Sequence, residues 1–373
     1  MRSERVKENL KKIDKKKLYL VIGFFVAIVI ILFGGAFIYN KFFYKRSYTE
    51  IENIMVNASK KYLAKNKDRL PKNYNEVVTL SDSDLVGAEE MDTISEYLKD
   101  ETSTCSGNIT VTNINGQYRY VPILDCGTKY KTVTFIDYIK KMVPVKESGV
   151  GLYQLNDELV YRGDAPNNYI KFSGKTYRIV KFTGDSAVII YTEKTNNVAW
   201  DDRYNTEKKM QMGINDYSVS RVKDTVDAFY QNEKVITPEN KLLVVAHSLE
   251  VGKRASKDTD KTGGLEKSAI IENQFVGLLP LYDYLNASLD SNCITSVSAA
   301  CMNYNYLSKY IYSWWTMTGT NQNTYSVYEI IGSNSSSLTN AASNGYYRPV
   351  LHLSKDALYV SGDGSSENPY IVK

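Results

Sequence analysis

The sequence predicts an α+β protein with an N-terminal transmembrane helix, a membrane-proximal helix with a small antiparallel sheet, and a larger mixed α+β domain. Three observations support this class: an uncharged run over residues 18–39, a helical stripe of apolar side chains after it, and short alternating strands between turn residues beyond that. We therefore divide the chain into a basic tail (1–17), a transmembrane helix (18–39), a stalk domain (40–141) and a C-terminal domain (142–373).

The uncharged run is long enough to cross a bilayer, whose hydrocarbon core is roughly 30 Å thick. Lysine and arginine give the tail a charge of +5 and residues 40–46 a charge of +3. This asymmetry predicts a cytoplasmic N-terminus, a single pass through the plasma membrane and an extracellular C-terminal domain. A cleaved secretory signal is the alternative, because Gly34 and Ala36 suit a cleavage site, but its apolar region usually spans about 7–15 residues.

The charge of the exported part argues against a nucleic-acid partner. The tail and residues 40–46 account for more than the whole net charge of +4, so residues 47–373 are acidic overall. Nucleic-acid-binding domains carry a basic excess. The basic tail is explained by membrane topology and by contact with the headgroups of the lipid bilayer.

The stalk domain opens with an amphipathic helix. Ser47 and Glu50 form a capping-box pattern, and Pro71 ends the helical segment. One stripe of the helix is apolar and contains Tyr48, Ile51, Met55, Ala58 and Tyr62. Residues 108–124 then predict a β-hairpin, because Asn115–Gly116 is a strong two-residue turn signal between alternating strands. Residues 135–144 predict a linker or a short helix before the C-terminal domain.

The four cysteines predict two disulfides. An even number of cysteines in an exported chain favours disulfides. They fall into two local pairs, Cys105 with Cys126 and Cys293 with Cys301. The first pair also lies at the two ends of the predicted hairpin, which brings the sulfurs within reach of each other.

Residues 18–130 resemble type IV pilins and pseudopilins in their long apolar helix, its amphipathic continuation and a small sheet closed by a cysteine pair. The fragments that carry the resemblance are Lys61–Lys65, Leu70–Pro71 and Cys105–Gly107. A prepilin has a processing glycine before the apolar stretch and a glutamate within it. Here Lys17 precedes the apolar stretch and no acidic residue lies within it, so we expect a pilin-like stalk that remains anchored in the membrane.

Residues 145–373 resemble exported domains of Gram-positive bacteria that are related in fold to C-type lectins and to the formylglycine-generating enzyme. Four segments carry the resemblance in the family's order: a Tyr-Arg-Ile strand, a Leu-Leu-Pro helix start, a Trp-Trp strand and an Arg-Pro-Val strand. They are Tyr177–Ile179, Leu278–Tyr284, Trp314–Thr318 and Arg348–Leu353. The resemblance implies a C-type-lectin-like α+β domain.

The candidate ligand-binding residues are aromatic and basic. They are Trp314, Trp315, Trp200 and Arg348. An exposed tryptophan could stack on a sugar or a peptide, but large aromatic side chains are mostly buried, so a core position is the alternative. For Arg348 the alternative is a structural ion pair with Asp201 or Asp202.

The sequence predicts no catalytic residue, metal site or cofactor. The formylglycine enzyme uses a cysteine pair, whereas Cys293 and Cys301 are separated by a polar loop that is typical of a structural disulfide. Calcium-binding spacings are missing, and Asp363 fits a hairpin turn. We interpret His247, at the end of an expected strand, as structural, and we place His352 on the strand face opposite Leu351 and Leu353.

These features predict an adhesin-like, single-pass cell-surface protein whose C-terminal domain binds an extracellular polymer, glycan or protein. The alternative is a pilin-like component of a surface fibre or secretion apparatus, with homo-oligomers formed through the membrane-proximal helix. An enzymatic role is a third hypothesis.

Overall fold

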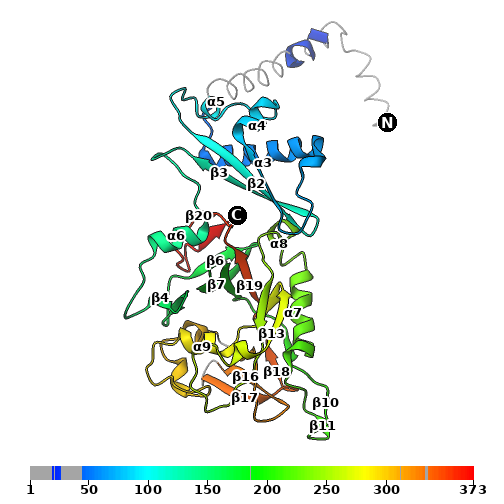
Figure 1. Cartoon of the computed structure of the whole chain (residues 1–373), viewed down its shortest axis with the longest axis vertical. Helices are drawn as coiled ribbons and strands as arrows, with labels where there is room; N and C mark the ends of the chain where they lie inside the picture. Colours follow the sequence, from blue (N-terminus) through cyan, green and yellow to red (C-terminus); the bar gives the residue numbers. More distant parts are fainter. Residues whose placement is uncertain (1–18, 21, 27–43, 185, 311, 332–334) are drawn as a thin grey trace, which may run out of the picture. The chain divides into compact units, whose positions relative to one another are not determined.

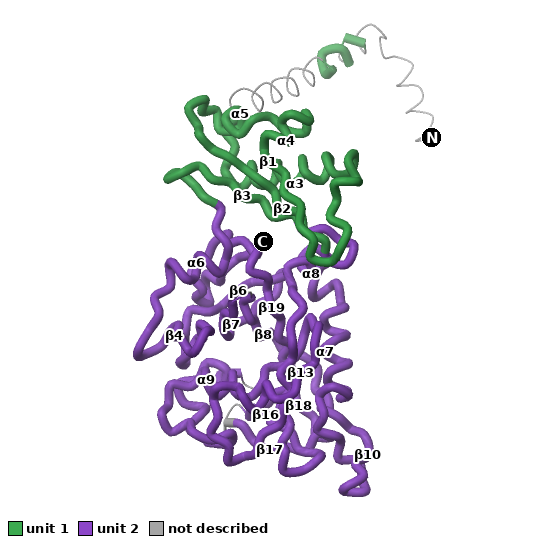
Figure 2. The backbone as a smooth tube through the Cα atoms, in the orientation of Figure 1, with its two compact units in different colours: residues 1–113, 120–131 green, residues 114–119, 132–373 purple. Residues whose placement is uncertain are grey.

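A computed structural model describes residues 19–20, 22–26, 44–184, 186–310, 312–331 and 335–373. It is a mixed α+β structure, as predicted, with several sheets and short helices. The chain forms two compact units, which Figure 2 shows in different colours. Unit 1 comprises residues 1–113 and 120–131, and unit 2 comprises residues 114–119 and 132–373.

The predicted transmembrane helix lies mostly outside the described residues. Of residues 18–39, the structure describes 19–20 and 22–26, which are helical. Within the described ranges, no helix combines the length and apolar character that a membrane crossing requires.

Over its described residues from 44 on, unit 1 contains the long helix α3, the short helices α4 and α5, and a sheet of order β1-β2-β3, in which β1 and β2 are antiparallel (Figure 2). Its elements are α3 (Tyr48–Lys65), β1 (Val77–Ser81), α4 (Asp82–Gly87), α5 (Ile94–Leu98), β2 (Ser106–Ile114) and β3 (Gln117–Asp125). Strand β1 was not predicted from the sequence.

Local signals place the elements of unit 1 well. The Ser47 hydroxyl caps α3 and the Glu50 carboxylate accepts from the Ser47 backbone N–H at 2.8 Å, so the predicted capping box is confirmed. The buried stripe of α3 differs at its end, where Leu63 is buried and Tyr62 only half-buried. Asn115 and Gly116 both have positive φ, as a tight hairpin turn requires, and Cys105 is disulfide-bonded to Cys126 across the open end of the hairpin.

Unit 2 is built on two larger sheets. Among the described residues, the first has nine strands, with β14-β19-β8-β7-β6-β21-β20 in line, β5 beside β7, and β4 beside β5. The second has the order β17-β16-β15-β18-β9. The strands of the first sheet are β4 (Gly151–Leu155), β5 (Glu158–Arg162), β6 (Tyr169–Phe172), β7 (Lys175–Phe182), β8 (Ser186–Tyr191), β14 (Val276–Gly277), β19 (Val350–Ser354), β20 (Tyr359–Ser361) and β21 (Tyr370–Val372). Those of the second are β9 (Asn197–Ala199), β15 (Trp314–Gly319), β16 (Ser326–Ile331), β17 (Ser335–Asn340) and β18 (Asn344–Tyr346).

Short ribbons and helices complete unit 2. Two strand pairs stand apart from the large sheets: β10 (Tyr204–Asn205) with β11 (Met210–Gln211), and β12 (His247–Glu250) with β13 (Ile270–Gln274). The helices are α6 (Phe135–Met142), α7 (Arg221–Gln231), α8 (Pro238–Lys241) and α9 (Leu281–Ala287). The helix start that the sequence predicted within Leu278–Tyr284 is confirmed, because α9 begins directly after Pro280.

The core of unit 2 follows from apolar runs in its central strands. Every residue of β8 and of β15 is buried, which is typical of strands covered on both faces. Helix α6 joins this core through Phe135, which contacts Phe182 and Tyr370 edge-on or tilted. Residues 132–141 thus belong to unit 2, whereas the sequence assigned them to the stalk domain.

Candidate functional site

Unit 2 contains a small pocket of about 70 Å³ beside the central strands. Its wall combines apolar side chains with carboxylates, hydroxyls, one lysine and both histidines of the chain. The polar lining residues are Glu158, Lys181, Thr183, His247, Ser248, Glu250, Tyr282, Asp283 and His352. None of them was predicted as a site residue.

The register of the first sheet assembles one wall of the pocket. Lys181 of β7 lies opposite Val188 of β8, and Val188 lies opposite His352 of β19. Residues opposite one another share a face of the sheet, so Lys181 and His352 point to the same side. On the other flank, Lys181 lies opposite Val160 of β5, which puts Glu158, two residues earlier, on that face as well.

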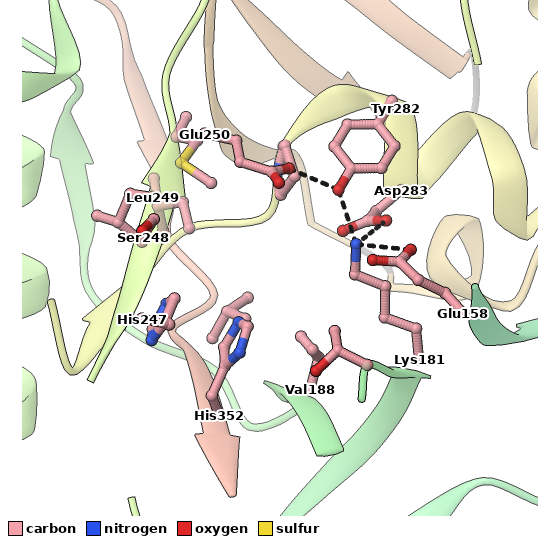
Figure 3. A pocket seen from close by; sticks show the side chains of 15 residues that line it. Glu158, Lys181, Val188, His247, Ser248, Leu249, Glu250, Tyr282, Asp283 and His352 are labelled. Carbon is pink, nitrogen blue, oxygen red and sulfur yellow. Dashed lines mark hydrogen bonds and ion pairs between the residues drawn. The ribbon is translucent and has the colours of Figure 1, made fainter. Parts of the chain in front are cut away.

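Lys181 lies at the centre of a polar cluster that also contains Glu158, Glu250, Tyr282 and Asp283 (Figure 3). Its Nζ lies 3.1 Å from Glu158 Oε2 and 3.1 Å from Asp283 Oδ1. The same Nζ donates a hydrogen bond of 2.7 Å to the hydroxyl of Tyr282. Since an ammonium has three donors, these three contacts satisfy it completely.

Helix α9 and strand β12 supply the rest of the cluster. Tyr282 and Asp283 are consecutive residues of α9, and the Tyr282 hydroxyl donates to Glu250 Oε2 at 2.6 Å. Glu250 also lies 3.9 Å from the half-exposed ammonium of Lys267. A continuous chain of contacts therefore runs from Asp283 through Lys181 and Tyr282 to Glu250.

Burial shapes the protonation of this cluster. Asp283 is 2% exposed, and burial raises its pKa to about 7 although the Lys181 ammonium opposes the rise. Burial also disfavours the charged form of Lys181, but the nearby carboxylates of Asp283, Glu158 and Glu250 outweigh this effect and raise its pKa. Near neutral pH, Lys181 is therefore an ammonium, and the Asp283 carboxyl group is protonated in a fraction of the molecules.

The two histidines stack on each other at the other side of the pocket. Their ring centroids are 3.6 Å apart and the ring planes differ by 12°. His352 Nδ1 is 3.0 Å from the Ser186 hydroxyl. Burial lowers the pKa of His247 to about 4 and holds that of His352 well below its ordinary value, so both rings are neutral at pH 7.

The structure corrects the expectation about His247 and confirms the one about His352. The strand that was expected to end at His247 instead begins there, because β12 spans His247–Glu250. The His352 side chain does lie on the other face of β19 from those of Leu351 and Leu353, where it is half-buried against His247. Residues far apart in the sequence thus form one contact.

The predicted tryptophan sites are in the core. Trp200, Trp314 and Trp315 are all 0% exposed. The indole N–H of Trp200 donates to the Thr316 carbonyl at 2.9 Å, and that of Trp315 to the Val198 carbonyl at 3.0 Å. These side chains present no surface for stacking on an extracellular ligand. The hydrogen bonds of Trp200 and Trp315 instead join strand β15 to strand β9 and to the residue that follows β9.

Arg348 is buried as well, and its predicted ion pairs are not formed. Its Nε donates to the Tyr191 carbonyl at 2.9 Å, and its guanidinium lies over the rings of Tyr310 and Trp314. The carboxylate of Asp201 pairs with Arg203, and that of Asp202 with Arg221. The prediction of an Arg348 pair with either aspartate is therefore wrong, and Arg348 is also absent from the pocket lining.

The remaining candidates have structural roles. Cys293 and Cys301 form the second predicted disulfide, and both are buried. Asp363 accepts from the Ser365 backbone N–H in the turn between β20 and β21. Among the residues that the structure describes, no cluster of histidine, cysteine and acidic side chains has the arrangement of a metal site.

Sequence signals for the pocket exist, although they are weak. Lys181 and Arg178 are the charged residues of the stretch Tyr177–Phe182, and Asp283 is the charged residue of helix α9. A charge among apolar residues indicates a buried partner, but it does not identify that partner. Comparisons with protein-family models, with curated proteins and with solved structures found no significant match to this chain.

Proposed function

We propose that this chain is a single-pass cell-surface protein whose unit 2 binds an extracellular ligand. The group of the ligand that it recognises is a protonated amine. The anchor is the uncharged run of residues 18–39, with the basic tail on the cytoplasmic side. Two disulfides support an exported location, since such bonds persist in oxidising compartments. The C-type-lectin-like resemblance of residues 145–373 is part of this proposal.

One observation carries the ligand chemistry: three carboxyl groups face the pocket against one ammonium group. Asp283 and Lys181 neutralise each other in the wall, while the side chains of Glu158 and Glu250 are 25% and 22% exposed. The histidines add no positive charge at neutral pH because their pKa values are lowered. This excess of partly exposed carboxylate favours a cation.

The size of the pocket limits what enters it. A volume of about 70 Å³ is small beside the roughly 300–1,000 Å³ of typical ligand pockets. It suits a small cationic group such as an ammonium better than a whole sugar. We therefore expect the amine end of a larger cell-wall polymer, glycan or protein to bind there.

Chemical blocking of amines tests this proposal. We expect the full chain in detergent to bind amine-bearing peptidoglycan, teichoic acid or polylysine, and to lose binding after N-acetylation of the same polymer. Glu250→Gln should weaken binding about tenfold, which corresponds to about 1.4 kcal/mol for one charge-assisted contact. Equal binding to free and acetylated polymers would contradict the proposal.

Two controls keep the test specific. Glu239→Gln removes one negative charge from an exposed position of α8 outside the pocket lining, so binding should be unchanged. Thermal unfolding of each variant verifies that the fold is retained. If Glu239→Gln weakens binding as much as Glu250→Gln, the overall charge of the surface is responsible.

A second candidate function is a pilin-like structural role for unit 1. The packing of α3 on the sheet favours it: the end of the Met55 side chain of α3 lies against Gly107 of β2. An amphipathic helix that packs on a small sheet is what the pilin resemblance implies. Oligomers of the full chain that depend on residues 18–62 would support this role, and a monomer in detergent would oppose it.

A further inference from the structure

The contacts of Lys181 have the geometry of a reaction site. Its amine lies 3.1 Å from the carboxyl oxygen of Asp283 and 3.1 Å from that of Glu158. Lys181 and Asp283 are 5% and 2% exposed, so water has little access to the contact between them. An amine held against a carboxyl group, with a second carboxylate beside both, is the arrangement that amide formation requires.

We propose that Lys181 and Asp283 are a covalent modification site, at which an isopeptide bond forms between Lys181 Nζ and Asp283 Cγ. The proposal goes beyond the binding function, and it does not depend on it. The bond would join β7 to α9 within unit 2 (Figure 1).

The reaction begins from the neutral form of the pair. An ammonium beside a carboxylate has the same atoms as an amine beside a carboxylic acid, so a single proton transfer interconverts them. Burial raises the pKa of Asp283 to about 7, whereas the surrounding carboxylates raise that of Lys181, so the pair of neutral amine and carboxylic acid is a minor form. The reaction proceeds from this minor form, in which the neutral amine of Lys181 is the nucleophile.

The step balances without any co-reactant. The Nζ lone pair attacks Asp283 Cγ, and the C–N bond forms as the Cγ–OH bond breaks. The Glu158 carboxylate accepts one proton from the attacking nitrogen and transfers it to the departing hydroxyl, which leaves as water. Glu158 ends as it began, nothing is oxidised or reduced, and the net change is the loss of one water molecule.

The surroundings favour the product. Groups held in contact react as if at effective concentrations of about 10⁵–10⁸ M, which offsets the unfavourable equilibrium of amide formation in water. The product also replaces two buried charges with a neutral amide, so a desolvation cost is removed. Since one charge of each sign is consumed, the carboxylates of Glu158 and Glu250 remain available to a cationic ligand.

Exposure distinguishes this pair from the other lysine–carboxylate contacts. Of the lysine–carboxylate pairs among the described residues, the pair of Lys181 and Asp283 has both side chains less than 10% exposed. The exposed fractions of the side chains alone are 6% and 3%. Lys175 with Glu193 has a similar separation of 3.2 Å, but the side chains are 34% and 41% exposed. Water therefore solvates the charged forms of the Lys175 pair, which makes it a matched control.

The intact mass of the purified full chain tests the proposal. After denaturation and reduction of the disulfides, the wild type should weigh about 18 Da less than its linear sequence. Lys181→Arg and Glu158→Gln should have their full linear masses, whereas Lys175→Arg should retain the deficit. Proteolysis of the wild type should yield one branched peptide that contains both residue 181 and residue 283.

Several outcomes would overturn the proposal. A folded wild type of full linear mass excludes the bond, and a deficit that persists in Lys181→Arg places it elsewhere. A deficit that persists in Glu158→Gln removes the proton-transfer role of Glu158. Asp283→Asn provides a second variant if Lys181→Arg does not fold: a deficit of about 17 Da, from loss of ammonia, or no deficit supports the assignment, and an unchanged deficit of about 18 Da contradicts it.

Discussion

Two of the buried basic side chains of unit 2, Lys181 and Arg348, have opposite surroundings. Lys181 is surrounded by oxygen atoms: two carboxylates and a phenol hydroxyl contact its Nζ. Arg348 is surrounded by carbon: its guanidinium lies 4.7 Å from the ring centroid of Tyr310 and 5.0 Å from that of Trp314. Among the described residues, Arg348 has no carboxylate partner and its Nη1 has no hydrogen-bond partner.

The difference separates a chemical site from a structural one. Carboxylates raise the pKa of Lys181 against the effect of its burial, whereas burial lowers the pKa of Arg348 to about 10. The Lys181 cluster borders a pocket and contains groups that can exchange protons. Aromatic faces around Arg348 offer attraction without proton transfer, which is suited to holding the strand β19 in place.

Lys181→Met should have the largest effect on stability. The substitution leaves the carboxyls of Asp283 and Glu158 close together without their shared cation. Removing one partner of a buried ion pair typically costs about 3–5 kcal/mol, and this value applies to chains in which the proposed Lys181–Asp283 amide has not formed. Chemical denaturation at pH 8 would measure the loss.

A double variant sharpens this test. Lys181→Met combined with Asp283→Asn leaves no uncompensated buried charge at the two positions, so most of the lost stability should return. If the double variant is as unstable as Lys181→Met, packing and not charge explains the loss.

Arg348→Met should have a smaller effect, of about 1–2 kcal/mol. The variant loses two cation–π contacts and the hydrogen bond to the Tyr191 carbonyl, but no carboxylate is left unpaired. The same denaturation experiment measures it. A loss larger than that of Lys181→Met would reverse the comparison and assign Arg348 a buried anionic partner.

Sequence reasoning was most accurate where the signal is local. The capping box at Ser47, the turn at Asn115–Gly116 and both disulfides depend on residues that are close in the chain, and the structure contains all of them. The short strand β1 was missed because it is stabilised by its pairing with β2, and its own sequence gives no clear strand pattern.

The pocket was not predicted because it depends on register between distant strands. Glu158, Lys181 and His352 meet only after β5, β7, β8 and β19 have paired in one register. Spacing along the chain contains no such information. The tryptophans were conspicuous for the opposite reason: their size attracts attention in a sequence, but the same size places them in the core.

His247→Phe should have the smallest effect at neutral pH and a larger one as the pH falls. The His247 pKa is lowered to about 4 in the folded protein, so the unfolded chain binds more protons between pH 4 and about 6.5. The histidine therefore contributes stability at neutral pH that is lost as pH falls through this window. In chains without the proposed amide bond, Asp283 acts oppositely, because its raised pKa makes the folded protein bind more protons between about pH 4 and 7.

The pH profile of this variant would sharpen the comparison between the two sides of the pocket. Phenylalanine retains a ring to stack on His352 but cannot be protonated, so His247→Phe should lose less stability than the wild type between pH 6.5 and 4, by about 3 kcal/mol at most. Unfolding midpoints in denaturant at each pH provide the measurement. Parallel profiles of variant and wild type would show that His247 has the same pKa in the folded and the unfolded protein. Asp283→Asn should change the profile in the opposite direction, which distinguishes the acidic wall of the pocket from its histidine wall.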